Sequence, residues 1–170
     1  MLMPGLVVLG SQAVGWSGWR RLSRLSSIRR TPAKQPVIAL PAELDASHLL
    51  DAVRQQFIRL QAAWDAADLS TLGALTTPQM LDEICAQFPP EGSPPNRTDV
   101  LTLQARLLCF DDFESAWLAT IEFSGMIREA PDREATPFRE LWLLTRECRE
   151  PFDPSSNCVP WRLARQQALL

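Results

Sequence analysis

The stretch FIRLQAAWDAADLSTL, Phe57–Leu72, decides the fold of this chain. It belongs to a longer segment, 47–68, in which apolar residues recur every three or four positions, the spacing of one helix face. Asp45 or Ser47 can cap the start of this helix by accepting backbone N–H bonds. We therefore expect one long packing helix, whose apolar face consists of Leu50, Val53, Phe57, Leu60, Trp64 and Ala67.

Two shorter helices are expected directly after the long one. Asp68 can cap a helix that ends near Leu75. The Thr-Pro pair at 77–78 places a capping hydroxyl before a proline at the first helical position, which predicts a helix that runs to about Phe88. Residues 89–95, rich in proline, form a loop.

After this loop the apolar period changes from helical to two. Apolar and polar residues alternate along 101–107 and 117–124, as they do in strands that bury one face. Residues 139–148 and 161–167 supply two more strands, and turn-forming residues separate the first three. Helices followed by antiparallel strands predict an α+β fold.

Charge is distributed unevenly along the 170 residues. Residues 1–42, the basic head, contain six cations and no acid, whereas residues 43–170, the body, contain all 20 acids and an excess of nine negative charges. A basic end on an acidic body suits contact with an anionic membrane surface at that end only. The acidic body argues against nucleic acid as a partner, because it would repel the phosphate backbone.

The basic head has the pattern of a short helix lying on a membrane surface. Two tryptophans directly precede an arginine pair, an arrangement typical of the membrane–water boundary. Apolar residues recur every three positions along 16–28, and the arginines fall largely on other sides. The candidate membrane-contact residues are Trp16, Trp19, Arg20, Arg21 and Arg24.

Other parts of the head limit this interpretation. The apolar run 2–10 is much shorter than the roughly 20 residues that a spanning helix needs. Residues 31–41 contain three prolines and are typical of a linker. A flexible tail from an over-extended or truncated gene start would explain the same residues, and this alternative stays open.

Six segments of the chain occur in a distinctive order. They are FIRLQAAWDAADLSTL (Phe57–Leu72), LTTPQMLDEI (Leu75–Ile84), NRTDVLTLQARLL (Asn96–Leu108), FSGMIRE (Phe123–Glu129), PFRELWLLTR (Pro137–Arg146) and WRLARQQ (Trp161–Gln167). Together they resemble the bacterial members of the Tim-forty-four-like family, named after the forty-four subunit of the mitochondrial inner-membrane translocase, an import-motor scaffold. The resemblance covers about 44–168. It implies a curved antiparallel sheet wrapped against helices, a cone like that of nuclear transport factor two.

The resemblance also implies a function. It indicates a non-catalytic domain, without a cofactor, that binds lipid or protein partners at the bacterial inner membrane, as a scaffold linked to transport. Bacterial relatives usually carry a signal peptide and long apolar segments before a basic stretch, which here are represented only by 2–10 and 20–34. The last hairpin, 147–159, is longer than the usual tight turn. A soluble cytoplasmic protein is the alternative.

Seven large apolar residues are candidates for a ligand pocket. We expect them to point into the space between sheet and helices, where core packing is their main role. A cone that is open at one end can also leave a cavity for an acyl chain or for an apolar side chain of a partner. The candidates are Phe57, Leu60, Trp64, Trp117, Phe123, Trp142 and Trp161.

The third strand is apolar on both faces. Leu141 and Leu143 share one face, and Phe138, Trp142 and Leu144 share the other. The outer face is therefore expected to be covered as well, by a partner protein, by a second copy in a homodimer, or by the basic head.

A soluble enzyme that uses the cone pocket is the alternative function. The chain has no Tyr, and its only His, His48, lies at a helix start. The acid–base candidates are Asp99, Asp111, Asp112 and Glu114; the adjacent pair can form a paired-carboxylate site or a solvated turn. No phosphate-binding glycine loop or nucleophile motif is present.

The four cysteines do not have the spacing of a metal site. None belongs to a C-x-x-C pair, and a zinc site needs about four closely grouped ligands. Cys148 and Cys158 can form a disulfide across the last hairpin, but we favour free and mostly buried thiols. The four are Cys85, Cys109, Cys148 and Cys158.

Overall fold

The computed structural model describes residues 38–42, 44–90, 92, 97–113, 115–147 and 160–169. Within these residues, three helices precede four strands, which confirms the predicted α+β class. The candidate membrane-contact residues, Glu114 and two of the cysteines, Cys148 and Cys158, lie outside the described residues. The elements are α2 (Ala46–Asp65), α3 (Leu69–Leu75), α4 (Pro78–Cys85), β1 (Asp99–Asp112), β2 (Ala116–Arg128), β3 (Thr136–Glu147) and β4 (Arg162–Ala168).

Each helix begins at a predicted capping residue. Asp45, Asp68 and Thr77 accept a hydrogen bond from the backbone N–H three residues further on, at 2.9, 3.1 and 3.3 Å. These bonds satisfy amide groups that have no partner within the helix. The starts of the helices are therefore set by local chemistry.

The long helix ends earlier than its apolar pattern predicts. α2 stops at Asp65, and Ala67 has a φ of 51°, the left-handed conformation that turns the chain toward α3. Ala67 is therefore exposed, and the prediction that it belongs to the apolar face is wrong. Leu50, at the opposite end of that face, is half-buried.

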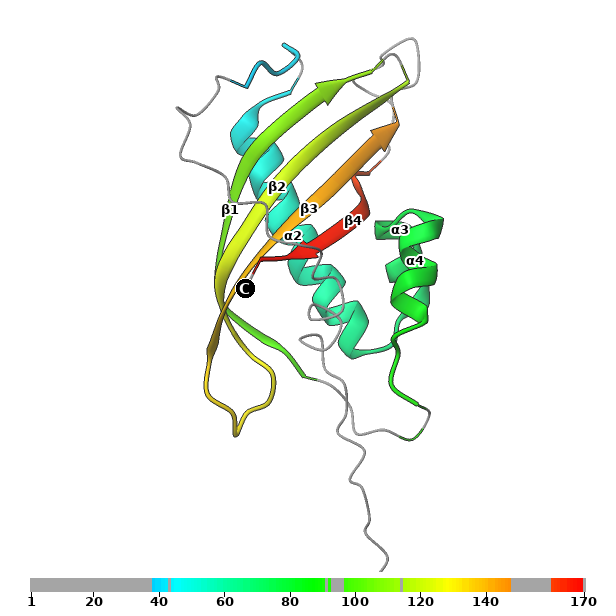
Figure 1. The fold of residues 1–170 in the computed structure, drawn as a ribbon, viewed down its shortest axis with the longest axis vertical. Helices are drawn as coiled ribbons and strands as arrows, with labels where there is room; N and C mark the ends of the chain where they lie inside the picture. The colour runs from blue at the N-terminus through cyan, green and yellow to red at the C-terminus, as the bar shows by residue number, and fades with distance from the viewer. Residues whose placement is uncertain are drawn as a thin grey trace, which may run out of the picture.

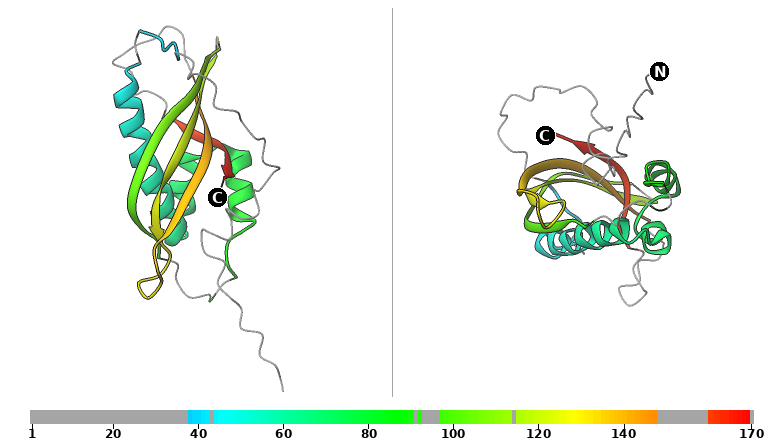
Figure 2. Two further views of the ribbon diagram at one scale, coloured as in Figure 1. Left: turned by 60° about the vertical axis from the view of Figure 1, so that its left-hand side comes forward. Right: turned by 90° about the horizontal axis from the view of Figure 1, so that it is seen from below.

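The four strands form one antiparallel sheet in the order β1-β2-β3-β4. The sheet is curved, α2 runs along one face of it, and α3 and α4 lie together beside β4 (Figures 1 and 2). β1 extends beyond the predicted range 101–107 at both ends. Bulges near Leu101 and Leu108 interrupt its alternation of apolar and polar residues, so the sequence pattern indicated only the part between them. Its outer edge faces away from β2 and is paired with no other strand in the described part of the chain.

The face of the sheet that meets the helices carries the core. On β2 this face consists of the buried residues Trp117, Ala119, Ile121 and Phe123. The outer face is less covered, since Leu141 and Leu143 of β3 are only half-buried. We predicted that a partner, a second copy or the basic head covers this face, and this stays a prediction.

The two cysteines that the structure describes are not core residues. Cys85 ends α4 and Cys109 lies on β1, and both are exposed thiols that form no disulfide. The expectation of mostly buried thiols is wrong for this pair. Cys109 lies just after a bulge in β1, opposite Thr120 on the outer face.

Candidate functional site

Three of the predicted pocket residues, Phe57, Phe123 and Trp142, form a closely packed aromatic cluster together with Phe138. Phe57 of α2 lies 5.0 Å from Phe123, 5.4 Å from Phe138 and 5.1 Å from Trp142, measured between ring centroids. All four rings are buried. Leu60, one turn further along α2, is buried as well. The apolar face of α2 therefore packs directly on β2 and β3.

The remaining pocket candidates lie in two separate places. Trp64 stacks on Phe88 at 4.5 Å, where the chain leaves α4. Trp117 and Trp161 both lie near Phe110 of β1, with ring centroids 5.9 and 6.4 Å from that of Phe110. None of the seven predicted pocket residues lines either of the two pockets described below. Their role in ligand binding stays a prediction, and their packing role is plain from their burial.

The acid–base candidates are not brought together. Asp111 and Asp112 are exposed, and their partners in β2 are consecutive residues, so their side chains point to opposite faces of the sheet. Asp99 lies at the other end of β1 and forms ion pairs with two arginines. His48 is exposed in the first turn of α2, with Nδ1 3.9 Å from the capping carboxylate of Asp45. No group of three or more potential metal ligands occurs in the described ranges.

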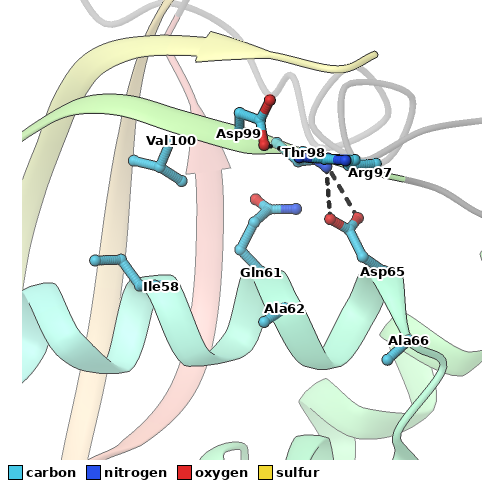
Figure 3. Close-up of a pocket in the computed structure, with 9 residues that line it drawn as sticks. All are labelled: Ile58, Gln61, Ala62, Asp65, Ala66, Arg97, Thr98, Asp99 and Val100. Carbon is cyan, nitrogen blue, oxygen red and sulfur yellow. Dashed lines mark hydrogen bonds and ion pairs between the residues drawn. The ribbon is translucent and has the colours of Figure 1, made fainter. Parts of the chain in front are cut away.

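The structure instead forms an open pocket between α2 and the start of β1. Its volume is about 680 Å³. The helix contributes one side and the strand the other, and Ile58 and Gln61 rise from α2 toward β1 (Figure 3). The lining residues are Ile58, Gln61, Ala62, Asp65, Ala66, Arg97, Thr98, Asp99 and Val100.

Asp65 joins the two sides of this pocket. Its carboxylate accepts a 2.6 Å hydrogen bond from the Thr98 backbone N–H and a 3.3 Å bond from the Thr98 hydroxyl (Figure 3). Burial raises the pKa of Asp65 above its ordinary value, although the Thr98 bonds and the nearby Gln61 amide favour the charged form. The described residues give Asp65 no ion pair with a cation.

Gln61 is the least satisfied polar residue of this pocket. Only 2% of it is exposed, yet neither atom of its amide forms a hydrogen bond of normal geometry among the described residues. A buried amide without a partner costs about 1–3 kcal/mol. The amide lies in the pocket, beside the carboxylate of Asp65 (Figure 3).

A second pocket of about 540 Å³ lies further along the same helix and strand. It extends over the edge of β1 to the outer face, where Glu122 accepts hydrogen bonds from Arg106 at 3.0 Å and Arg139 at 2.7 Å. Burial opposes ionisation of Glu122, but these arginines outweigh it and lower its pKa. The three charges link β1, β2 and β3.

Buried polar residues are the feature that sequence reasoning missed. Glu140 has no exposed surface and accepts a hydrogen bond from Gln166 of β4. Gln56 donates to the carbonyls of Leu75 and Trp161 at 3.2 and 2.9 Å, which ties α2 to the end of α3 and the start of β4. The period of two in β3 could have placed Glu140 on the inner face, between Phe138 and Trp142.

Comparison with known proteins identifies the family. The family model described as Tim44-like domain matches residues 35–168, and the chain therefore belongs to this family. Membership indicates a membrane-associated scaffold that binds proteins. The match begins inside the predicted linker. Comparison with the curated proteins gave no match.

Among solved structures, the chain is similar to a nuclear transport factor 2 (NTF2-like) superfamily protein from Salmonella enterica subsp. enterica serovar Typhimurium str. LT2. The sequence identity is 10%, the coverage is 73% of this chain and 92% of that chain, and the TM-score is 0.39. In the part of the chain that the structure describes, the helices are too short or too polar to cross a membrane.

Proposed function

We propose that this protein is a non-catalytic scaffold domain that holds a protein partner at the bacterial inner membrane. In this proposal the basic head attaches to anionic lipid and the body engages the partner. The observation that carries it is the Tim44-like match, which extends over most of the body. A bound lipid and a homodimer through the outer sheet face are further parts of the proposal.

The charge distribution supports separate roles for the two parts of the chain, membrane binding for the basic head and partner binding for the body. Each Lys or Arg near an anionic membrane surface contributes about 1 kcal/mol of binding. The head has six such residues without an acid, whereas the body carries an excess of acids and would be repelled. The membrane contact is therefore expected in the head alone.

The geometry of the described residues favours binding over catalysis. The central aromatic residues fill the space between α2 and the sheet, and the carboxylates at the end of β1 point apart. Open pockets occur instead beside an unpaired strand edge, a kind of surface that can contact a partner chain. The partner contact is therefore expected on the body.

Sedimentation with lipid vesicles tests the membrane part of this proposal. Replacing Arg20, Arg21 and Arg24 with glutamine should weaken binding to anionic vesicles by roughly a hundredfold, at about 1 kcal/mol per charge. The matched control replaces three exposed arginines of the body, Arg59, Arg133 and Arg165, with glutamine and should leave binding nearly unchanged, because these residues lie outside the head.

Deletion of residues 1–35 should abolish sedimentation with the same vesicles. A truncated body that still sediments, or equal losses in the two triple variants, would refute the basic head as the anchor. Vesicles of zwitterionic lipid provide the lipid control, because they lack the negative surface potential that attracts the arginines.

A further inference from the structure

The two pockets lie between α2 and the outer edge of β1, and together we call them the α2–β1 groove. Its helix side presents residues 54, 58, 61, 62, 65 and 66, which share one face of α2. Its strand side presents residues 98–100 and 103–106. Ile58, in the middle of the helix side, is 50% exposed, which is unusual for an isoleucine beside a core.

The strand side of this groove is an unpaired sheet edge. β1 pairs with β2 on one side only, and no described strand covers its other side. An edge strand presents backbone N–H and C=O groups that can pair with another chain. The bulges near Leu101 and Leu108 interrupt the strand, which leaves Thr102–Leu107 as a regular segment six residues long.

The helix side of the groove offers a complement to a peptide group. Gln61 carries an N–H donor and a carbonyl acceptor on one amide, and neither atom forms a hydrogen bond of normal geometry with the residues that the structure describes. A peptide group has the same pair of functions, so it can satisfy both atoms of the Gln61 amide. An acyl chain could satisfy neither, and it would leave the desolvated amide as costly as before.

The charges of the groove favour a basic occupant. Its arginines already have acidic partners: Arg54 pairs with Asp51, Arg97 with Asp99, and Arg106 with Glu122. Among the described residues, the groups that stabilise the carboxylate of Asp65 are neutral: Thr98 and the nearby Gln61 amide. A lysine or arginine of a partner would supply the missing positive charge at a half-buried position.

We propose that the α2–β1 groove binds an extended segment of a partner protein, which adds a strand to β1 along Thr102–Leu107 and places a lysine or arginine beside Asp65. Apolar side chains on one face of this added strand cover Ile58 and Ala62 on α2. The proposal rests on the proposed function, because it gives the location and the chemistry of the protein contact. It assigns this contact to a different surface from the membrane-binding head.

Peptide selection tests this proposal on the full chain in solution. Short random peptides displayed on phage are selected against the immobilised protein, and selected sequences are synthesised with a fluorescent label for anisotropy titration. Ala62→Trp fills the groove from an exposed helix position, and Ala52→Trp places the same side chain on an exposed position of α2 outside the groove lining.

We expect peptides with apolar alternation and a lysine or arginine. Ala62→Trp should weaken their binding at least about tenfold, equal to about 1.4 kcal/mol, whereas Ala52→Trp should change it less than about twofold. Hydrogen exchange, followed by NMR, should slow at alternate backbone amides within residues 102–107 when peptide is bound, because the amides that point away from β2 donate hydrogen bonds to the added strand.

Three results would overturn the proposal: no peptide selected above background, equal loss of affinity in both tryptophan variants, or protection that appears on the outer face of β3 instead of on β1. Vesicles are absent from this experiment, so its failure leaves the membrane part of the proposed function standing. Conversely, a full chain that binds the peptide but does not sediment with anionic vesicles would refute the basic-head anchor and leave the groove proposal standing.

Discussion

Replacing Phe57 with alanine should lower the free energy of unfolding by about 4 kcal/mol, the middle of the range for truncating a buried phenylalanine to alanine in a packed core. Phe57 has no exposed surface, and its ring contacts Phe123, Phe138 and Trp142 with centroid distances of 5.0 to 5.4 Å. The substitution therefore removes three aromatic contacts, each worth about 0.5–1.5 kcal/mol beyond buried area, and leaves a cavity that these stiff neighbours cannot fill. Urea denaturation followed by tryptophan fluorescence measures the loss.

The neighbouring residue provides a matched control. Ile58 is half exposed in the α2–β1 groove, so Ile58→Ala should cost less than about 1 kcal/mol. The result that would refute the packing argument is a loss of less than about 1.5 kcal/mol for Phe57→Ala, since a ring that borders an open ligand cavity leaves no new void. A changed urea dependence (m-value) would indicate that the two-state comparison does not hold.

Two further predictions concern the sheet. Gly125→Ala should destabilise the protein by more than about 2 kcal/mol, because an added Cβ would lie 1.9 Å from the backbone oxygen of Thr102. In contrast, Gly73→Ala in helix α3 should stabilise it by roughly 0.5–1 kcal/mol, because the added Cβ would lie at an ordinary 3.4 Å from the Leu81 side chain of α4. Thermal unfolding of both variants checks this pair, and a stable Gly125→Ala protein would contradict the described register. Glu122→Gln should cost about 1 kcal/mol at neutral pH. Because folding lowers the pKa of Glu122, its contribution is present above the ordinary value of 4.5 and is lost as the pH falls through the lowered pKa. Unfolding curves of wild type and variant should therefore converge in acid, and a difference that persists there would contradict the assignment to charge.

The elements that follow from local chemistry could be predicted from the sequence. Helix starts at Asp45, Asp68 and Thr77 depend on a side chain that reaches an amide three residues away, which is visible in any sequence. The order of helices and strands follows from the change of apolar period in the same way. The end of α2 is harder to predict, because the left-handed turn at Ala67 uses a residue without a turn preference.

The candidate groove could not be predicted, because it depends on contacts between distant residues. The bonds between Asp65 and Thr98 join positions 33 residues apart, and no spacing rule links them. The two bulges that limit the free edge of β1 also lack a glycine or another sequence mark. The seven predicted pocket residues are buried, but large apolar residues that point inward fill space as readily as they surround a cavity.

Glu140 shows a different limit of sequence reasoning. Its position two residues from Phe138 and from Trp142 places it on the inner face, but an acidic residue is normally expected in solvent. The hydrogen bond from Gln166 makes its burial tolerable, and that partner comes from β4, after the long last hairpin. Only the pairing of β3 with β4 brings these two side chains together.

Hydrogen exchange measured by mass spectrometry, with and without anionic vesicles, tests the central claim most directly, because it reports on head and body in one experiment. Vesicles should slow exchange in peptides from residues 1–35 and leave exchange in peptides from α2 and the four strands unchanged. Raising the salt concentration should remove the protection, since the contact is electrostatic. Protection that appears in the sheet or in α2 and is absent from the head would contradict the account.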